Sequence, residues 1–217
     1  MSGAKTGMIR NLIFDMGGVI ITLSPEVAME RFRQLGVANA FELMGIYGHK
    51  DIFLQCENGQ LSGDEFIQKL SEKVGRQVSY EEAAYGWLGY AKEVPMKRLH
   101  LLEKLRQKGY TVMLLSNTNP FMMEWTRSNH FCQEGRPITD FFDRLYCSYE
   151  LKMYKPDPAF FRYVLDDAGI KAEESLFIDD GQVNLDGAAS VGLHTLLAKP
   201  DEDWTVELQK ILNVSLI

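Results

Sequence analysis

The sequence has few cysteines, no long apolar run and no excess of basic charge. Its 217 residues include only three cysteines, which are far apart and form no CxxC pair, so neither a disulfide framework nor a structural zinc site is expected. No apolar run reaches the roughly 18 residues of a membrane span, so no membrane association is expected. The first apolar stretch is broken at once by Asp15 and Gly17-Gly18, unlike a signal peptide, and a cytoplasmic protein is therefore expected.

The charge balance is acidic. The chain carries 23 basic and 30 acidic side chains, a formal net charge of −7. Surfaces that bind nucleic acids are basic, so the composition argues against a nucleic-acid partner. An acidic surface also repels anions at long range, so a phosphorylated substrate would need a bound cation or local hydrogen-bond donors.

From Pro95 onward, helical and strand-like segments alternate. The strand-like segments are short, apolar and rich in β-branched residues, which is typical of a parallel sheet covered on both faces. We therefore predict an α/β fold with a Rossmann-like parallel sheet. Its expected strands are residues 9–14, 110–116, 144–148, 175–179 and 194–198.

Residues 24–93 have a different character. Ser24-Pro25 is a typical helix start, and no strand-like run stands out in this region. Helices are expected near residues 26–35, 49–57, 63–74 and 80–91. We predict an all-helical module, residues 24–93, inserted into an α/β core formed by residues 1–23 and 94–217.

Polar residues follow the predicted strands at one edge of the sheet, where ligands bind in open α/β folds. They are Asp15, Ser116-Asn117 and Asp179-Asp180, and Lys155 precedes Pro156 before a later helix. The carboxylates of Asp15 and Asp180 are suitable ligands for Mg²⁺, which prefers a few carboxylates together with water and substrate phosphate. Lys155 adds a positive charge and Ser116 a hydrogen-bond donor, which leaves Asp15 as a nucleophile toward phosphorus.

Four segments, in order, resemble the motifs of the haloacid dehalogenase (HAD) superfamily: IFDMGGVI, LLSNTN, YKP and FIDDGQVN. The resemblance covers residues 9–198, and the helical insertion resembles that superfamily's C1-type cap. It implies that Asp15 is the nucleophile, Ser116 a phosphate ligand, Lys155 a charge stabiliser, and Asp180 a Mg²⁺ ligand together with the backbone carbonyl of Gly17. We also expect Asn117 to contact the substrate, and Asp179, Asn184 and Glu57 to support the site.

The sequence departs from the superfamily's usual pattern at Gly17. Most HAD phosphatases carry a second aspartate there as general acid and base, and glycine cannot transfer a proton. Asn184 replaces the last acidic residue of the fourth motif, which is a milder change. Together these forms resemble a branch that contains sugar-1-phosphate phosphatases. An anomeric oxygen leaves more easily than an ordinary alcohol, so such a substrate would tolerate loss of the acid.

The expected function is therefore a Mg²⁺-dependent phosphatase acting on a small phosphorylated metabolite, with a sugar phosphate as one candidate. Other HAD chemistry, namely a phosphotransferase, phosphonate hydrolase or dehalogenase, is an alternative, although the retained aspartate pair argues for a metal and against a dehalogenase. A non-catalytic module that binds a phosphometabolite is a second alternative. On the insertion, His49, Gln55 and Glu57 precede a bend at Asn58-Gly59 and are candidates for reading a sugar. The pattern indicates no particular oligomeric state.

Overall fold

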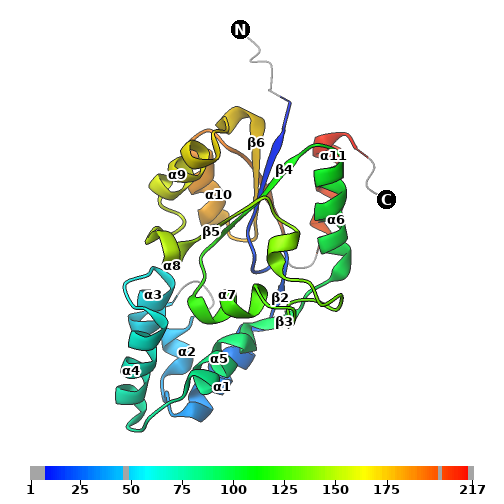
Figure 1. Cartoon of the computed structure of the whole chain (residues 1–217). Helices are drawn as coiled ribbons and strands as arrows, with labels where there is room; N and C mark the ends of the chain where they lie inside the picture. The colour runs from blue at the N-terminus through cyan, green and yellow to red at the C-terminus, as the bar shows by residue number, and fades with distance from the viewer. Residues whose placement is uncertain (1–7, 46–48, 200–201, 215–217) are drawn as a thin grey trace.

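The computed structural model describes residues 8–45, 49–199 and 202–214. Its centre is a parallel sheet of five strands in the order β5-β4-β1-β6-β7 (Figure 1). The strands are β1 (Asn11–Phe14), β4 (Thr111–Ser116), β5 (Arg144–Cys147), β6 (Ser175–Asp179) and β7 (His194–Leu197). The predicted Rossmann-like α/β fold is thus confirmed.

Helices cover both faces of this sheet, as continuous apolar strands require. Successive residues of β1 point to opposite faces: Leu12 and Phe14 pack with one set of helices and Ile13 with the other. The first set is α6 (Met96–Gln107) and α11 (Trp204–Leu212), and the second is α9 (Pro158–Ala168) and α10 (Gln182–Ala189). Two short helices, α7 (Pro120–Thr126) and α8 (Ser148–Leu151), follow β4 and β5.

The early part of the chain forms a second, helical layer beyond the carboxyl ends of the strands (Figure 1). Its helices are α1 (Pro25–Leu35), α2 (Ala40–Leu43), α3 (Asp51–Glu57), α4 (Gly63–Val74) and α5 (Tyr80–Trp87). They enclose a core of their own, with Phe32, Phe53, Phe66 and Trp87 packed edge to face or tilted. Among the described residues of the sheet layer, those of α7 contribute buried side chains to this core, through Phe121 and Met122.

The inserted segment is not wholly helical, and the expected helix over 80–91 is wrong at its end. Helix α5 stops at Trp87, a 3₁₀ turn spans Leu88–Tyr90, and β3 (Ala91–Glu93) pairs antiparallel with β2 (Thr22–Leu23). Gly89 brings the turn against α1, where an added Cβ would lie 2.6 Å from Ala28 Cα. The three residues of β3 are too few to show a strand periodicity in the sequence. They form a strand because they pair with β2.

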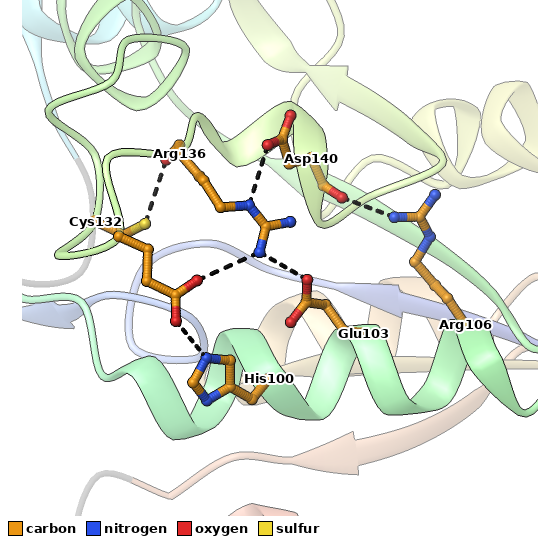
Figure 2. Close-up of polar contacts among 7 residues, drawn as sticks. His100, Glu103, Arg106, Cys132, Arg136 and Asp140 are labelled. Atoms are coloured by element: carbon orange, nitrogen blue, oxygen red, sulfur yellow. Dashed lines mark hydrogen bonds and ion pairs between the residues drawn. The ribbon is translucent and has the colours of Figure 1, made fainter.

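The loop between α7 and β5 is tied to α6 by a network of surface ion pairs (Figure 2). Arg136 is its hub, with Nη1 2.8 Å from Glu103 Oε1 and Nε 3.2 Å from Asp140 Oδ2. Beside it, His100 Nε2 lies 2.7 Å from Glu134 Oε1. A single exposed ion pair contributes little to stability. Arg136 contacts several acidic side chains at once and so links the loop to α6. Across the described ranges, no helix is both long and apolar enough to cross a membrane.

Candidate active site

Three carboxylates meet where neighbouring strands of the sheet end. Asp15 directly follows β1, and Asp179 ends β6 with Asp180 next to it. Since β1 and β6 are paired in parallel, these residues leave the sheet at the same edge. One oxygen atom from each carboxylate lies within 4.8 Å of the others. The structure therefore brings together the acidic residues that the sequence placed after these strands.

Lys155 reaches the same point from the loop between α8 and α9. Its Nζ lies 2.8 Å from Asp15 Oδ1 and 2.7 Å from Asp179 Oδ2, and the residue is only 2 % exposed. Burial alone would disfavour the ammonium charge, but the carboxylates of Asp15 and Asp179 outweigh it and raise the pKa of Lys155. The lysine is therefore a fixed positive charge beside the predicted nucleophile.

Asn117 holds the backbone that carries this lysine. Its side-chain oxygen accepts a 2.9 Å hydrogen bond from the Lys155 N–H, and its amide nitrogen donates a 3.0 Å hydrogen bond to the Lys155 carbonyl. The peptide bond from Lys155 to Pro156 is cis. Both amide atoms of Asn117 are engaged in this contact, which fixes the backbone of Lys155. The expected contact of Asn117 with the substrate stays a prediction.

Asp179 and Asn184 form a support for the charged cluster. Asp179 is fully buried, and its Oδ1 accepts hydrogen bonds from the Gly181 N–H at 2.8 Å and from Asn184 Nδ2 at 3.0 Å. An ionised aspartate at position 184 could not donate this hydrogen bond and would add a further negative charge. The asparagine in the fourth motif is thus explained by its contact with Asp179.

The carboxylate cluster fits a divalent cation. Burial first, and then the charges of Asp179 and Asp180, raise the pKa of Asp15 to about 7 although Lys155 acts in the opposite direction. Burial and the charge of Asp179 likewise raise the pKa of Asp180 to about 6. A Mg²⁺ ion bound to Asp15 and Asp180 would offset this repulsion. Gly17, whose carbonyl is the third predicted ligand, follows Asp15 by two residues in the turn after β1.

The turn after β1 approaches Asp180 so closely that residue 18 must be glycine. Gly18 has a φ of +74°, and a Cβ there would collide with the Asp180 carboxylate. Gly17 has no such φ, and the nearest atom to an added Cβ there would be the terminal Cδ1 of the Leu23 side chain, at 3.1 Å. Of these two glycines, Gly18 is therefore the one whose backbone conformation and close contact require glycine.

We expect Gly18→Ala to weaken Mg²⁺ binding by about tenfold or more, because its Cβ displaces a predicted metal ligand, and to destabilise the fold by about 1–3 kcal/mol through backbone strain. Gly75→Ala is the matched control, since Gly75 has a φ of +72° but no atom within 4 Å of its added Cβ. Calorimetric titration with Mg²⁺ and urea unfolding separate the two effects. Wild-type Mg²⁺ affinity in Gly18→Ala would contradict the close approach.

Ser116 and Glu57 lie around the same sheet edge. Ser116, the last residue of β4, is buried, and its hydroxyl donates a long 3.4 Å hydrogen bond to the Asn117 carbonyl. Glu57 ends α3, and its Oε2 accepts a 3.0 Å hydrogen bond from the hydroxyl of Tyr154, the residue before Lys155. Sequence reasoning missed Tyr154, although its place directly before Lys155 in the YKP motif was a usable signal.

An open parallel sheet with Asp15, Lys155 and Asp180 at its carboxyl edge is the arrangement expected of a phosphoryl-transfer hydrolase. The model of the haloacid dehalogenase-like hydrolases matches residues 9–192, and the chain belongs to this family. It is 41 % identical over 206 residues to the D-ribitol-5-phosphate phosphatase of Bacteroides thetaiotaomicron, covering 95 % of this chain and 100 % of that protein. It is 26 % identical to a sesquiterpene phosphatase of Aspergillus oryzae over 92 % of this chain and 95 % of that protein.

Solved structures agree with this assignment. A HAD-like family hydrolase from Porphyromonas gingivalis superposes with a TM-score of 0.90 at 36 % identity, covering 96 % of this chain and 100 % of that one. A HAD family enzyme from Bacteroides thetaiotaomicron, in complex with magnesium and inorganic phosphate, superposes with a TM-score of 0.86 at 38 % identity, covering 92 % of this chain and 98 % of that one. The predicted family and the predicted class of enzyme are confirmed.

Proposed function

We propose that this protein is a Mg²⁺-dependent phosphatase that hydrolyses a small phosphorylated sugar or polyol through an aspartyl-phosphate on Asp15. The observation that carries the proposal is Lys155, which is buried and held at 2.8 Å from Asp15 and 2.7 Å from Asp179, with Asp180 alongside. A nucleophilic carboxylate, a fixed cation and a cation site at one sheet edge suit phosphoryl transfer. The solved complex of a relative with magnesium and phosphate supports it.

In the proposed reaction, a carboxylate oxygen of Asp15 attacks phosphorus and the bond to the substrate oxygen breaks. Lys155 offsets negative charge on the phosphoryl group and on Asp15, while the Ser116 hydroxyl donates to a phosphate oxygen. Asp15, Asp180 and the Gly17 carbonyl would hold Mg²⁺, which would neutralise charge on the phosphoryl group. Water then hydrolyses the aspartyl-phosphate and restores the carboxylate of Asp15.

We further propose that residues 24–93 act as a cap over a core of residues 1–23 and 94–217. The helical layer has its own apolar core and lies beyond the carboxyl edge of the sheet, where it excludes water from the reacting groups. We place the enzyme in the cytoplasm, which is supported by three free, buried cysteines, a usual state in a reducing compartment.

A panel of phosphate esters tests the proposed substrate class. Because the chain is 41 % identical to a D-ribitol-5-phosphate phosphatase, we expect kcat/KM for ribitol 5-phosphate and related open-chain polyol phosphates to exceed that for hexose 1-phosphates by about tenfold or more, a difference of about 1.4 kcal/mol in transition-state binding. Release of inorganic phosphate is measured with Mg²⁺ present. A lack of release from every ester would contradict the proposed phosphatase, and a preference for hexose 1-phosphates would contradict the polyol assignment.

A further inference from the structure

A buried polar cluster joins the helical layer to the sheet edge that carries Asp15. Its centre is Glu57, which is 7 % exposed. Glu57 Oε2 accepts a hydrogen bond from the Tyr154 hydroxyl and lies 2.9 Å from His49 Nδ1. Among the described residues, Nδ1 has no hydrogen bond of acceptable geometry, so this is a close contact between the imidazole nitrogen and the carboxylate oxygen. On its other side, His49 Nε2 lies 2.7 Å from the Tyr90 hydroxyl.

The end of α3 is docked on the loops that follow the strands. The Ser148 hydroxyl donates a 2.5 Å hydrogen bond to the Glu57 carbonyl and accepts a 2.9 Å hydrogen bond from the Thr118 N–H. Two residues beyond Glu57, the chain passes so close to α8 that a Cβ on Gly59 would collide with the Tyr149 carbonyl. Glu57 is therefore fixed over the carboxyl edge of the sheet by contacts with two of its loops.

Tyr154 joins this cluster to the segment that carries Lys155. Burial raises the pKa of Tyr154, as do the charge of Glu57 and, more weakly, that of Asp15, whereas a contact with Asn117 lowers it. Tyr154 directly precedes Lys155, whose Nζ lies 2.8 Å from Asp15 Oδ1. Its 3.0 Å hydrogen bond to Glu57 Oε2 therefore places the buried Glu57 carboxylate beside the segment that carries the lysine of the site.

The site needs a proton donor that its motif does not provide. If the substrate is a polyol phosphate, the leaving group is a primary alkoxide, for which a general acid contributes about 10²–10⁴-fold in rate. Gly17 has no side chain, Lys155 and Asp179 are paired with each other, and Asp180 belongs to the cation site. Among the described residues of this edge, Glu57 is the carboxylate without such a role.

We propose that Glu57, paired with His49, is the general acid and base of this enzyme and takes the role that Gly17 cannot fill. As Asp15 attacks phosphorus and the ester bond breaks, the leaving oxygen takes the bond's electron pair and a proton from the Glu57–His49 pair. The pair then accepts a proton from the water that attacks the aspartyl-phosphate, so it returns to its starting state. This inference rests on the proposed function, because it assigns a residue to that reaction.

Glu57→Gln tests the proposal, because glutamine keeps the shape of glutamate and can still accept from Tyr154 but cannot transfer the proton. For ribitol 5-phosphate, kcat/KM is expected to fall by about 10²–10⁴-fold. For 4-nitrophenyl phosphate, whose leaving group needs no proton, kcat/KM is expected to change by less than about tenfold. With this ester the variant should also release a burst of nitrophenol equal to the enzyme concentration, because hydrolysis of the aspartyl-phosphate has lost its base.

Asp51→Asn is the matched control, since it removes a carboxylate from the far end of the same helix, where Asp51 pairs with Lys73; both esters should react as with the wild type. An equal loss for both esters in Glu57→Gln, or no loss, would overturn this inference while leaving the phosphatase assignment intact. A wild-type enzyme inactive toward both esters would overturn the proposed function itself.

A measurement on the wild type keeps the inference testable if Glu57→Gln does not fold. With a general acid in place, kcat/KM should depend only weakly on the pKa of the leaving alcohol across a series of alkyl and aryl phosphates. The expectation from Gly17 alone is the opposite, namely a strong preference for aryl and anomeric esters. A steep dependence on the leaving group would therefore overturn the role of Glu57.

Discussion

Asp15→Asn is expected to lower kcat for a phosphate monoester by at least about 10³-fold, because the amide removes the attacking carboxylate oxygen while nearly preserving its shape. The substitution also takes one of the two carboxylate partners from Lys155, whose Nζ lies 2.8 Å from Asp15 Oδ1. Steady-state release of phosphate measures the effect. Trapping of phosphorylated protein after an acid quench should succeed with the wild type and fail with the variant.

The fold should survive this substitution. Burial and two neighbouring aspartates raise the pKa of Asp15 to about 7, so in the metal-free protein its stabilising contribution is lost as the pH rises through that value. Asparagine does not ionise, and the variant should unfold at the same temperature as the wild type or higher at pH about 8. Asp166→Asn, on the exposed face of α9, is the control. Near wild-type turnover in Asp15→Asn would remove Asp15 from its assigned role.

Removal of the metal should abolish turnover. Excess chelator is expected to reduce phosphate release to background, and added Mg²⁺ should restore it, because Asp15 and Asp180 otherwise repel the phosphoryl group and each other. Saturating Mg²⁺ should also raise the unfolding temperature, with about 2.7 kcal/mol gained at a hundredfold excess over Kd. Activity that persists in metal-stripped protein with excess chelator would exclude this role.

The same site predicts a pH dependence of Mg²⁺ binding. The pKa of Asp15 is raised to about 7 and that of Asp180 to about 6, and only the ionised carboxylates bind the cation. Protons therefore compete increasingly as the pH falls, and the Mg²⁺-induced shift in unfolding temperature should shrink between about pH 8 and about pH 5. A shift that stays constant over this range would argue that neither carboxylate binds the ion.

Much of the site could be predicted because the carboxyl ends of parallel strands lie at the same edge of the sheet. Residues that directly follow different strands are therefore close in space. Asp15, Ser116 and Asp179 each stand at the end of a short apolar run, and β1 lies between β4 and β6. The polar residues at the ends of these neighbouring strands can therefore be placed together from the sequence alone. β6 begins and ends where it was expected, at Ser175 and Asp179.

The contacts that cross from one layer to the other could not be predicted in the same way. The capping box of Ser62 and Glu65 is local and visible in the sequence, but the docking of Glu57 on Ser148 joins residues 91 positions apart. Such a contact depends on how the helical layer lies over the sheet, which no periodicity encodes. The pairing of β2 with β3 was missed for the same reason.

The pairing of β2 with β3 also brings the two ends of the inserted segment together. Thr22 lies opposite Glu93 and Leu23 opposite Ala91, so the inserted segment leaves and re-enters the sheet layer at one place. A segment with adjacent ends can grow, shrink or be exchanged without disturbing the order of the strands around it. The helices can therefore vary without moving Asp15, Lys155 or Asp180. The end of α3, which carries Glu57, is the part of the insertion that the proposed proton transfer would hold constant.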